Sequence, residues 1–229
     1  MSFNIRVIIP AFNEQNAICN VVGEIPMDLV REVIVVNNGS TDNTVAQAIS
    51  CGATVLDEEK KGYGNACLKG INYLINLDKK TDVIVFIDAD YSDYPEEMSN
   101  LIEPILNNEA DLVIGSRALG NREKGSMTVP QVFGNWLATN LLRIFYGVRF
   151  TDLGPFRAIR YDSLIKLGMV DRNYGWTVEM QFKAAKQKLR CTEIPVKYRK
   201  RIGVSKVSGT LKGTILAGYK IIWTIFKYL

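Results

Sequence analysis

The chain has 229 residues, with 28 Lys and Arg against 24 Asp and Glu, and its net charge of +4 is too small to indicate nucleic-acid binding. The absence of histidine excludes Ser-His and Cys-His nucleophilic pairs and a His-ligated zinc site. The groups that remain for catalysis are carboxylates, Lys and Arg side chains, and a metal ion bound through oxygen.

Short apolar runs alternate with helix-like stretches through the first half of the chain. Apart from Arg6, the runs are apolar throughout: Ile5–Ile9, Val33–Val36, Val83–Ile87 and Leu112–Ile114. Such runs are typical of strands buried on both faces of a parallel sheet. The predicted helices between them are Glu14–Ile25, Asp42–Ser50, Asn65–Leu77 and Pro95–Asn107. This alternation predicts right-handed βαβ units and a doubly wound, mostly parallel α/β sheet flanked by helices.

The second half of the chain is less regular. Gly and Pro among charges across residues 117–130 predict a mobile loop, and residues 131–148 follow with helical spacing. A strand, a helix and a further strand are predicted over Pro155–Arg160, Thr177–Lys188 and Arg190–Tyr198.

Residues 214–229 again have helical spacing, with apolar side chains on nearly all sides and Lys220 and Lys227 on one flank. A helix of this kind must be buried in something. It either packs on its own domain or on a second subunit, or it lies in a membrane interface with its lysines at lipid phosphates.

The cysteine pattern and the N-terminus predict a cytoplasmic location. No Cys-x-x-Cys pair occurs among the four cysteines, and the first residues run straight into a strand without a secretory signal. We therefore expect four reduced thiols. No apolar run reaches the roughly 20 residues of a spanning helix, which leaves peripheral contact with the inner face of the membrane as the expected mode of association.

Polar residues follow three of the predicted strands. They lie in Pro10-Ala11-Phe12-Asn13-Glu14, in Asn37–Thr44 and in Asp88-Ala89-Asp90. The carboxyl ends of strands in an open α/β sheet are where ligands bind. Each motif alone is compatible with a turn or a helix cap. Their occurrence together, in this order, predicts one ligand site at that edge of the sheet.

The Asp88-Ala89-Asp90 motif predicts a site for Mg²⁺ or Mn²⁺, because hard cations prefer carboxylate oxygens. A cation bound there would stabilise the negative charge of a leaving diphosphate. We expect Asp90 to reach the metal and Asp88 to contact a metal-bound water or the ribose. Asp93 precedes Pro95 and is expected to cap the next helix.

Other segments carry side chains suited to a charged substrate. Lys61 lies in a turn with two glycines before a helix, whose N-terminus attracts phosphate. Glu179 lies in the first turn of a later helix and is either a base for an acceptor hydroxyl or a carboxylate favoured by the helix dipole. The basic segment Tyr198–Lys206 is either a solvated turn or a clamp on phosphates, which Arg117 would join.

Together these motifs resemble family 2 glycosyltransferases of the GT-A fold, and most closely the branch with dolichol-phosphate mannose synthases and bacterial polyprenyl-phosphate sugar transferases. The matching segments are PAFNE (10–14), VVNNGSTDNT (35–44), KGYGNA (61–66), FIDADYSDYPEE (86–97), IGSR (114–117), DLGPFRAIR (152–160), GWTVEM (175–180) and RIGVSKVSGT (201–210). The resemblance implies a GT-A catalytic domain over residues 1–213 and an amphipathic helix over residues 214–229. It also implies hexose transfer from a UDP- or GDP-sugar with inversion at the anomeric carbon.

The resemblance also implies roles for individual residues. The nucleoside pocket would be lined by Pro10, Asn13 and Glu14. Asn38 stands where the family has an aspartate that meets the base or ribose, and Lys61 would approach the diphosphate. Asp88 and Asp90 match the metal motif, and Glu179 matches the carboxylate that faces the acceptor. The loop that closes over the donor would contribute Lys200, Arg201, Ser205 and Lys206.

The resemblance implies a polyprenyl phosphate as acceptor. Mannose synthases of this branch carry basic residues after the mobile loop, whereas residues 130–135 contain no cation here, and Arg117 and Arg143 are candidates for that charge. The alternative acceptor is a hydroxyl of a saccharide or small molecule, with Glu179 as base. A nucleotidyltransferase is disfavoured, because PAFNE stands where a Gly-rich loop is typical. A non-catalytic nucleotide-sugar-binding scaffold is the remaining alternative, and a homo-oligomer is compatible with each of them.

Overall fold

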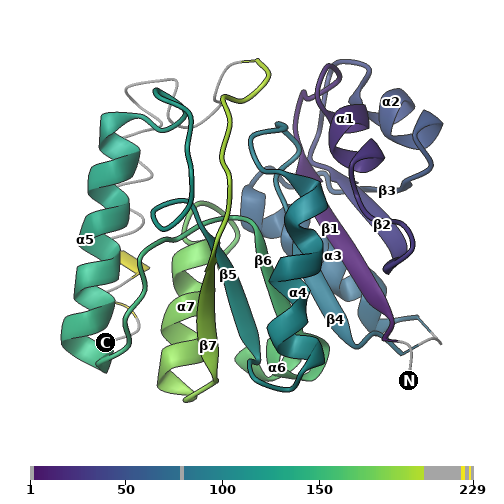
Figure 1. Ribbon diagram of the computed structural model, residues 1–229. Helices are drawn as coiled ribbons and strands as arrows, with labels where there is room; N and C mark the ends of the chain where they lie inside the picture. The colour runs from purple at the N-terminus through teal and green to yellow at the C-terminus, as the bar shows by residue number, and fades with distance from the viewer. Residues whose placement is uncertain (1–2, 78–79, 204–222, 225–226, 228–229) are drawn as a thin grey trace.

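The computed structural model describes residues 3–77, 80–203, 223–224 and 227 (Figure 1). Its strands are β1 (Ile5–Ala11), β2 (Val30–Asn37), β3 (Thr54–Asp57), β4 (Val83–Phe86), β5 (Leu112–Ser116), β6 (Arg157–Arg160) and β7 (Cys191–Pro195). Within these ranges the strands form one seven-stranded sheet in the order β3-β2-β1-β4-β6-β5-β7. All pairings are parallel except those of β6, which runs antiparallel to β4 and β5. The mostly parallel sheet is thus confirmed.

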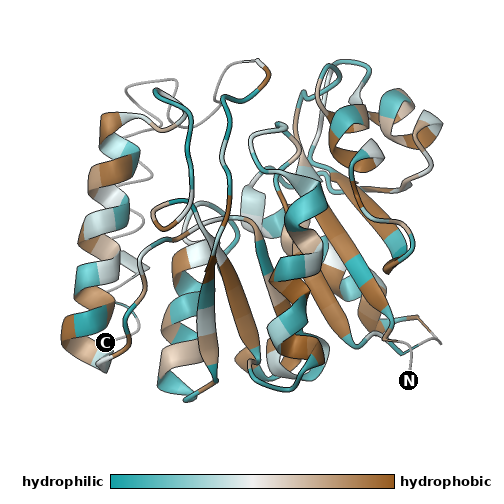
Figure 2. Ribbon diagram, viewed as in Figure 1, coloured by the Kyte–Doolittle hydropathy of each residue, from teal (hydrophilic) through white to brown (hydrophobic). Residues whose placement is uncertain are grey.

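Helices cover both faces of the sheet (Figure 1). They are α1 (Ile18–Gly23), α2 (Thr44–Ser50), α3 (Tyr63–Ile75), the 3-10 turn η1 (Pro95–Glu97), α4 (Met98–Leu106), α5 (Val129–Tyr146), α6 (Tyr161–Leu167) and α7 (Trp176–Lys186). One core cluster joins the sheet to α1, α2 and α4, and a second joins its other face to α3, α5, α6 and α7. The strands β1, β2, β4 and β5 are mostly apolar (Figure 2), because both faces of the sheet are covered there.

Helix α5 has strong end signals, and they place it where residues 131–148 were predicted to be helical. Thr128 caps its N-terminus in a capping box with Gln131, and Gly147 ends it in the left-handed region at φ 68°. The helix stands at the left of Figure 1. Much of its apolar surface is exposed, including Phe133 and Trp136.

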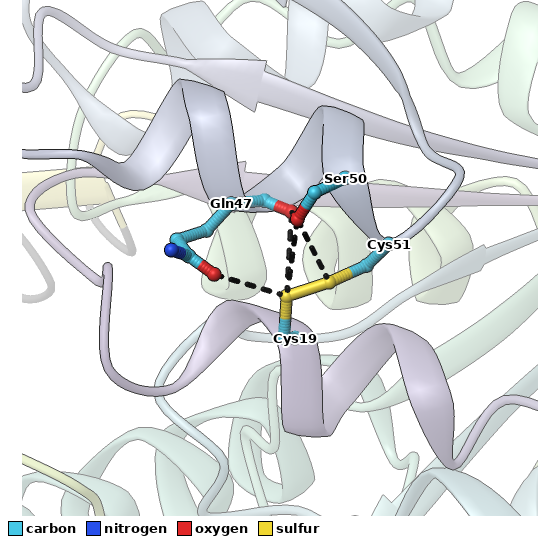
Figure 3. Close-up of a disulfide and its surroundings, with 4 residues drawn as sticks. All are labelled: Cys19, Gln47, Ser50 and Cys51. Atoms are coloured by element: carbon cyan, nitrogen blue, oxygen red, sulfur yellow. Dashed lines mark hydrogen bonds between the residues drawn. A yellow bond between two sulfur atoms is a disulfide. The ribbon is translucent and has the colours of Figure 1, made fainter.

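A disulfide joins Cys19 in α1 to Cys51, the residue after α2, with the Ser50 hydroxyl beside the sulfurs (Figure 3). The prediction of four reduced thiols is therefore wrong, and the free cysteines among the described residues are Cys67 and Cys191. Because β1 and β2 are neighbouring parallel strands, α1 and α2 pack side by side. This brings the two Cα atoms to 5.7 Å across 32 residues of sequence.

Removing the disulfide is expected to lower the free energy of unfolding by about 3–4 kcal/mol, because closing a loop of this length restricts the unfolded chain. Urea unfolding of Cys19→Ala/Cys51→Ala against wild type measures the loss. As a control, a reducing agent should lower the stability of the wild type to that of the variant and leave the variant unchanged. Equal stability of oxidised wild type and variant would contradict the prediction.

The predicted helix of residues 214–229 lies outside the described residues, apart from Trp223, Thr224 and Lys227. Thr224 is buried, and its hydroxyl oxygen lies 2.5 Å from where a Cβ on Gly175 would stand. At this residue the chain packs against the start of α7. None of the described helices has the length and apolar character needed to cross a bilayer.

Candidate functional site

A pocket of about 290 Å³ opens at the carboxyl ends of β1, β2 and β4. The predicted site residues that line it are Pro10, Glu14, Asn38, Lys61, Asp88, Asp90 and Arg201. The sheet thus brings all three strand-end motifs together, as the sequence predicted. Asn13, Arg117, Glu179 and Lys200 do not line the pocket, and Ser205 and Lys206 lie outside the described residues.

The loops after β1 and β2 are tied to each other by hydrogen bonds. The Glu14 amide donates to Thr44 Oγ1 at 2.8 Å, and the Asn13 amide donates to Ser40 Oγ at 3.0 Å. Asn13 Oδ1 in turn accepts from the Thr41 amide at 2.8 Å. Asn13 therefore shapes the wall of the pocket from behind, whereas Glu14 lines the pocket.

The Asn38 side chain fixes the turn that leads into α3. Its amide group donates to the carbonyls of Glu58 and Lys60, and its Oδ1 accepts from the Gly62 amide at 2.7 Å. Gly62 has φ 139°, and a Cβ there would lie 2.1 Å from the Arg172 carbonyl oxygen, so this turn requires glycine. With its amide hydrogens in use, Asn38 can offer a ligand only an acceptor lone pair.

Asp88 and Asp90 lie on the segment after β4 and interact electrostatically. Asp88 Oδ1 accepts a hydrogen bond from the Tyr63 hydroxyl at 3.0 Å. Burial first, and then the charge of Asp90, raise the pKa of Asp88 to about 6. Asp90 Oδ1 accepts from the amide and the hydroxyl of Ser92 at 2.9 and 2.5 Å. Because the negative charges of Asp88 and Asp90 repel each other, a cation close to both carboxylates would stabilise them.

Arg201 supplies a cation from the chain itself. Its guanidinium lies 3.1 Å from Asp90 Oδ2 and 3.0 Å from Glu14 Oε1. Among the described residues, no group of three or more His, Cys, Asp and Glu is placed to hold a metal, so a cation bound between Asp88 and Asp90 would need further oxygen ligands from substrate or water. Mg²⁺ commonly binds through one or two carboxylates together with substrate phosphates and water, and the two aspartates fit that donor set.

Glu179 lies outside the pocket, in the buried face of α7. Its side chain is fully buried, and its carboxylate accepts from the amides of Val170 and Asp171 and pairs with Lys183 Nζ at 2.8 Å. These contacts fix the loop before α7, which carries the pocket residue Tyr174. The arrangement is that of a positioning residue, and a role as base stays a prediction.

Arg117 pairs with Asp152, and its guanidinium also stacks over Tyr198, the first residue of the basic segment, 5.0 Å from the ring centroid. The guanidinium makes two parallel hydrogen bonds to the Asp152 carboxylate, at 2.8 and 2.7 Å, and both side chains are buried. Lys200 is exposed, and its amide donates to Glu123. Neither side chain reaches the pocket in this arrangement.

Several residues at or beside the pocket were not predicted from the sequence. Tyr63 and Tyr174 lie within matched or neighbouring segments, but no pattern indicated that they face a ligand. Asp93 was expected to cap a helix, and this is wrong. Tyr94 occupies the cap position, and both Asp93 carboxylate oxygens are buried without a hydrogen-bond partner among the described residues.

Replacing Asp93 with Asn should increase stability by an amount that grows with pH. Burial first, and then the charge of Asp88, raise the pKa of Asp93 well above its ordinary value of 3.8. The folded state therefore retains a proton that the unfolded state has lost, so stability falls as pH rises from about 4 toward the folded pKa. The Asn variant carries no such proton. Melting temperatures of both proteins from pH 4 to 8, without metal, measure the difference, and a difference independent of pH would refute the assignment.

Comparisons with known proteins identify the family of the chain. The model of the family Glycosyl transferase family 2 matches residues 6–168. The chain is 33% identical to an undecaprenyl-phosphate mannosyltransferase of Micrococcus luteus, over 91% of this chain and 89% of that protein. It is 30% identical to a polyprenol monophosphomannose synthase of Mycolicibacterium smegmatis, over 89% of this chain and 81% of that protein.

Solved structures share the fold. Glucosyl-3-phosphoglycerate synthase of Mycobacterium tuberculosis, crystallised with Mn²⁺, UDP-glucose and phosphoglyceric acid, aligns with a TM-score of 0.76. The alignment covers 99% of this chain and 79% of that chain at 23% identity. At this identity the likeness establishes the architecture alone.

Proposed function

We propose that this chain, which belongs to glycosyl transferase family 2, transfers a hexose from a UDP- or GDP-sugar to a polyprenyl phosphate, with Mg²⁺ or Mn²⁺ bound by Asp88 and Asp90. Two relatives that align with most of the chain, at 33% and 30% identity, are named as an undecaprenyl-phosphate mannosyltransferase and a polyprenol monophosphomannose synthase. Their names support the acceptor class, and they make mannose the first sugar to test.

One structural observation favours a phosphate acceptor over a hydroxyl. The carboxylates that line the described pocket are Glu14, Asp88 and Asp90, of which Glu14 and Asp90 pair with Arg201. Glu179, the predicted base, is buried outside the pocket. A hydroxyl acceptor needs a base to remove its proton. A phosphate monoester, with a second pKa of about 6, is already ionised near neutral pH.

In the proposed reaction an acceptor phosphate oxygen attacks the anomeric carbon, and the bond from that carbon to the diphosphate breaks. Inversion at that carbon is the expectation for a single displacement. A bound divalent cation would neutralise charge developing on the leaving diphosphate. Lys61, at the mouth of the pocket, adds a second positive charge for the phosphates. Tyr63 holds Asp88 in place by its hydrogen bond.

Helix α5 supports contact with a lipid surface. Its exposed apolar side chains include Phe133 at 60%, Trp136 at 57% and Ile144 at 72% exposure. Aromatic side chains of this kind are enriched where proteins meet the membrane–water interface. A polyprenyl acceptor resides in a membrane, so we propose that α5 forms part of a peripheral membrane contact.

The test compares two acceptors of equal chain length, a polyprenyl phosphate and the matching polyprenol. Purified protein, Mn²⁺ and radiolabelled GDP-mannose or UDP-glucose are incubated with each acceptor in detergent. We expect labelled lipid with the phosphate only, and none when Mn²⁺ is chelated. Labelled lipid from the polyprenol alone would establish the hydroxyl alternative, and labelled lipid without any metal would contradict the role of the two aspartates.

Replacing Glu179 with Gln separates a base from a positioning residue. We expect a lower melting temperature, because the buried pair with Lys183 is lost, and kcat within about tenfold of wild type at temperatures where the variant is folded. Lys183→Met is the matched control, since it breaks the same pair without removing the carboxylate. A folded Glu179→Gln protein with kcat reduced about 10³-fold, beside an active Lys183→Met protein, would instead assign a catalytic proton transfer to Glu179.

A further inference from the structure

The guanidinium of Arg201 lies where two pocket carboxylates meet. It is 3.1 Å from Asp90 Oδ2 through one terminal nitrogen and 3.0 Å from Glu14 Oε1 through the other. Asp90 is 5% and Glu14 is 8% exposed, so this cation neutralises carboxylates that have little access to water. Buried like charges without a counter-ion are costly. Arg201 therefore does in this structure what a bound cation would do.

The backbone on both sides of Arg201 is fixed to the loop that carries Asp90. The Ile202 amide donates to the Asp90 carbonyl at 3.0 Å, and the Arg199 amide donates to the Ser92 carbonyl at 2.9 Å. The Arg199 guanidinium also stacks on Tyr91, 3.4 Å from the ring centroid. Any change of partner by Arg201 is therefore a rotation of its side chain about a fixed backbone.

One donor of Arg201 is unused. Its Nε–H is buried and has no hydrogen-bond partner among the described residues. A guanidinium presents its donors as a fork that matches carboxylate or phosphate oxygens. An unsatisfied buried donor in a pocket is satisfied when an oxygen-rich anion enters.

From these contacts we infer that Arg201 is an internal stand-in for the divalent cation: it holds Asp90 and Glu14 in the metal-free enzyme, and metal binding transfers its guanidinium to the diphosphate of the nucleotide. The inference rests on the proposed function. It adds that metal and nucleotide bind cooperatively, because the metal releases Arg201 from Asp90 and the diphosphate then binds the released guanidinium. The metal takes the carboxylate of Asp90, and the diphosphate takes the released guanidinium.

This exchange has a thermodynamic signature that distinguishes it from simple charge attraction. A metal that must displace Arg201 binds with an apparent Kd equal to its intrinsic Kd divided by the fraction of enzyme in which the ion pair is open. A nucleotide that captures Arg201 removes this penalty, and by reciprocity the metal tightens nucleotide binding by the same factor. Deleting the guanidinium should tighten the binding of metal alone while weakening the binding of nucleotide.

The experiment measures Mn²⁺ binding by the electron paramagnetic resonance signal of free Mn²⁺, with and without UDP or GDP. For Arg201→Met we expect Mn²⁺ alone to bind about fivefold or more tightly than to wild type. We expect UDP or GDP at saturating Mn²⁺ to bind about tenfold or more weakly. The ratio of the Mn²⁺ Kd values without and with nucleotide should shrink toward one.

Lys61→Met is the matched control, because it removes one positive charge from the same pocket without breaking a pair with Asp90. It should weaken nucleotide binding, with a much smaller change in the Kd of Mn²⁺ alone. Equal tightening of Mn²⁺ in both variants, or no tightening in Arg201→Met, would overturn the inference and leave the proposed function standing. A wild-type protein that binds no Mn²⁺ with or without nucleotide would overturn both the inference and the proposed metal site.

Discussion

Replacing Asp90 with Asn is expected to lower kcat for hexose transfer by about 10³-fold or more, equivalent to about 4 kcal/mol of barrier. Asp90 is 5% exposed in the pocket and carries the charge that pairs with Arg201. An amide at this position keeps an acceptor for Ser92 but removes the negative charge that a divalent cation requires. The measurements are steady-state kcat with saturating Mn²⁺ and the Kd of Mn²⁺ by calorimetry.

Asp57→Asn is the matched control for this prediction. Asp57 is exposed at the end of β3, accepts a hydrogen bond from Asn37, and does not line the pocket. The Asp57→Asn substitution removes the same charge at the same edge of the sheet. We expect kcat within about threefold of wild type, as is usual for surface positions. A folded Asp90→Asn protein that keeps Mn²⁺-dependent turnover would contradict the metal assignment, as would equal losses in the two variants.

The sequence predicts the parts of the fold that rest on burial. The apolar runs that became β1, β2, β4 and β5 are covered on both faces, and a strand so placed is predominantly apolar. Strand β3 was missed because it is a four-residue, half-buried edge strand with the sequence TVLD. Helix α6 was missed because seven residues carry little periodicity. The antiparallel direction of β6 was not predicted either, since apolar composition carries no sign of strand direction.

The candidate site, like the fold, was only partly predictable from the sequence. The strand-end motifs could be placed together because parallel strands end at one edge of a sheet. The contact of Arg201 with Glu14 joins residues 187 positions apart, and no local pattern encodes it. Nor does the sequence show which face of α7 carries Glu179. Its position in the first turn suits both a base and a buried carboxylate, and only packing separates the two.

Replacing Arg117 with Met should produce the largest loss of stability, about 3–5 kcal/mol, because it leaves the carboxylate of Asp152 buried without the cation that neutralises it. Asp152 is 1% exposed and accepts from the Arg117 guanidinium at 2.8 and 2.7 Å. For a chain of this size the loss corresponds to roughly 10 °C in melting temperature.

Arg190→Met is the matched control. Arg190 makes a similar paired contact with Asp111, but its side chain is exposed, and solvent screens such pairs. Its variant should lose only a small part of what Arg117→Met loses.

The same variant distinguishes a structural from an acceptor-binding role for Arg117. The Arg117–Asp152 pair joins the two ends of the segment that leaves β5, forms α5 and returns to β6, so breaking it should loosen α5 as well as the core. If Arg117 acts only through this pair, KM for the lipid phosphate should stay near the wild-type value in a variant kept well below its melting temperature. Adding Asp152→Asn should then recover part of the lost stability, since no buried charge remains uncompensated. A KM for the lipid phosphate raised about tenfold or more in the folded single variant, and not restored in the double variant, would instead place Arg117 at the acceptor phosphate.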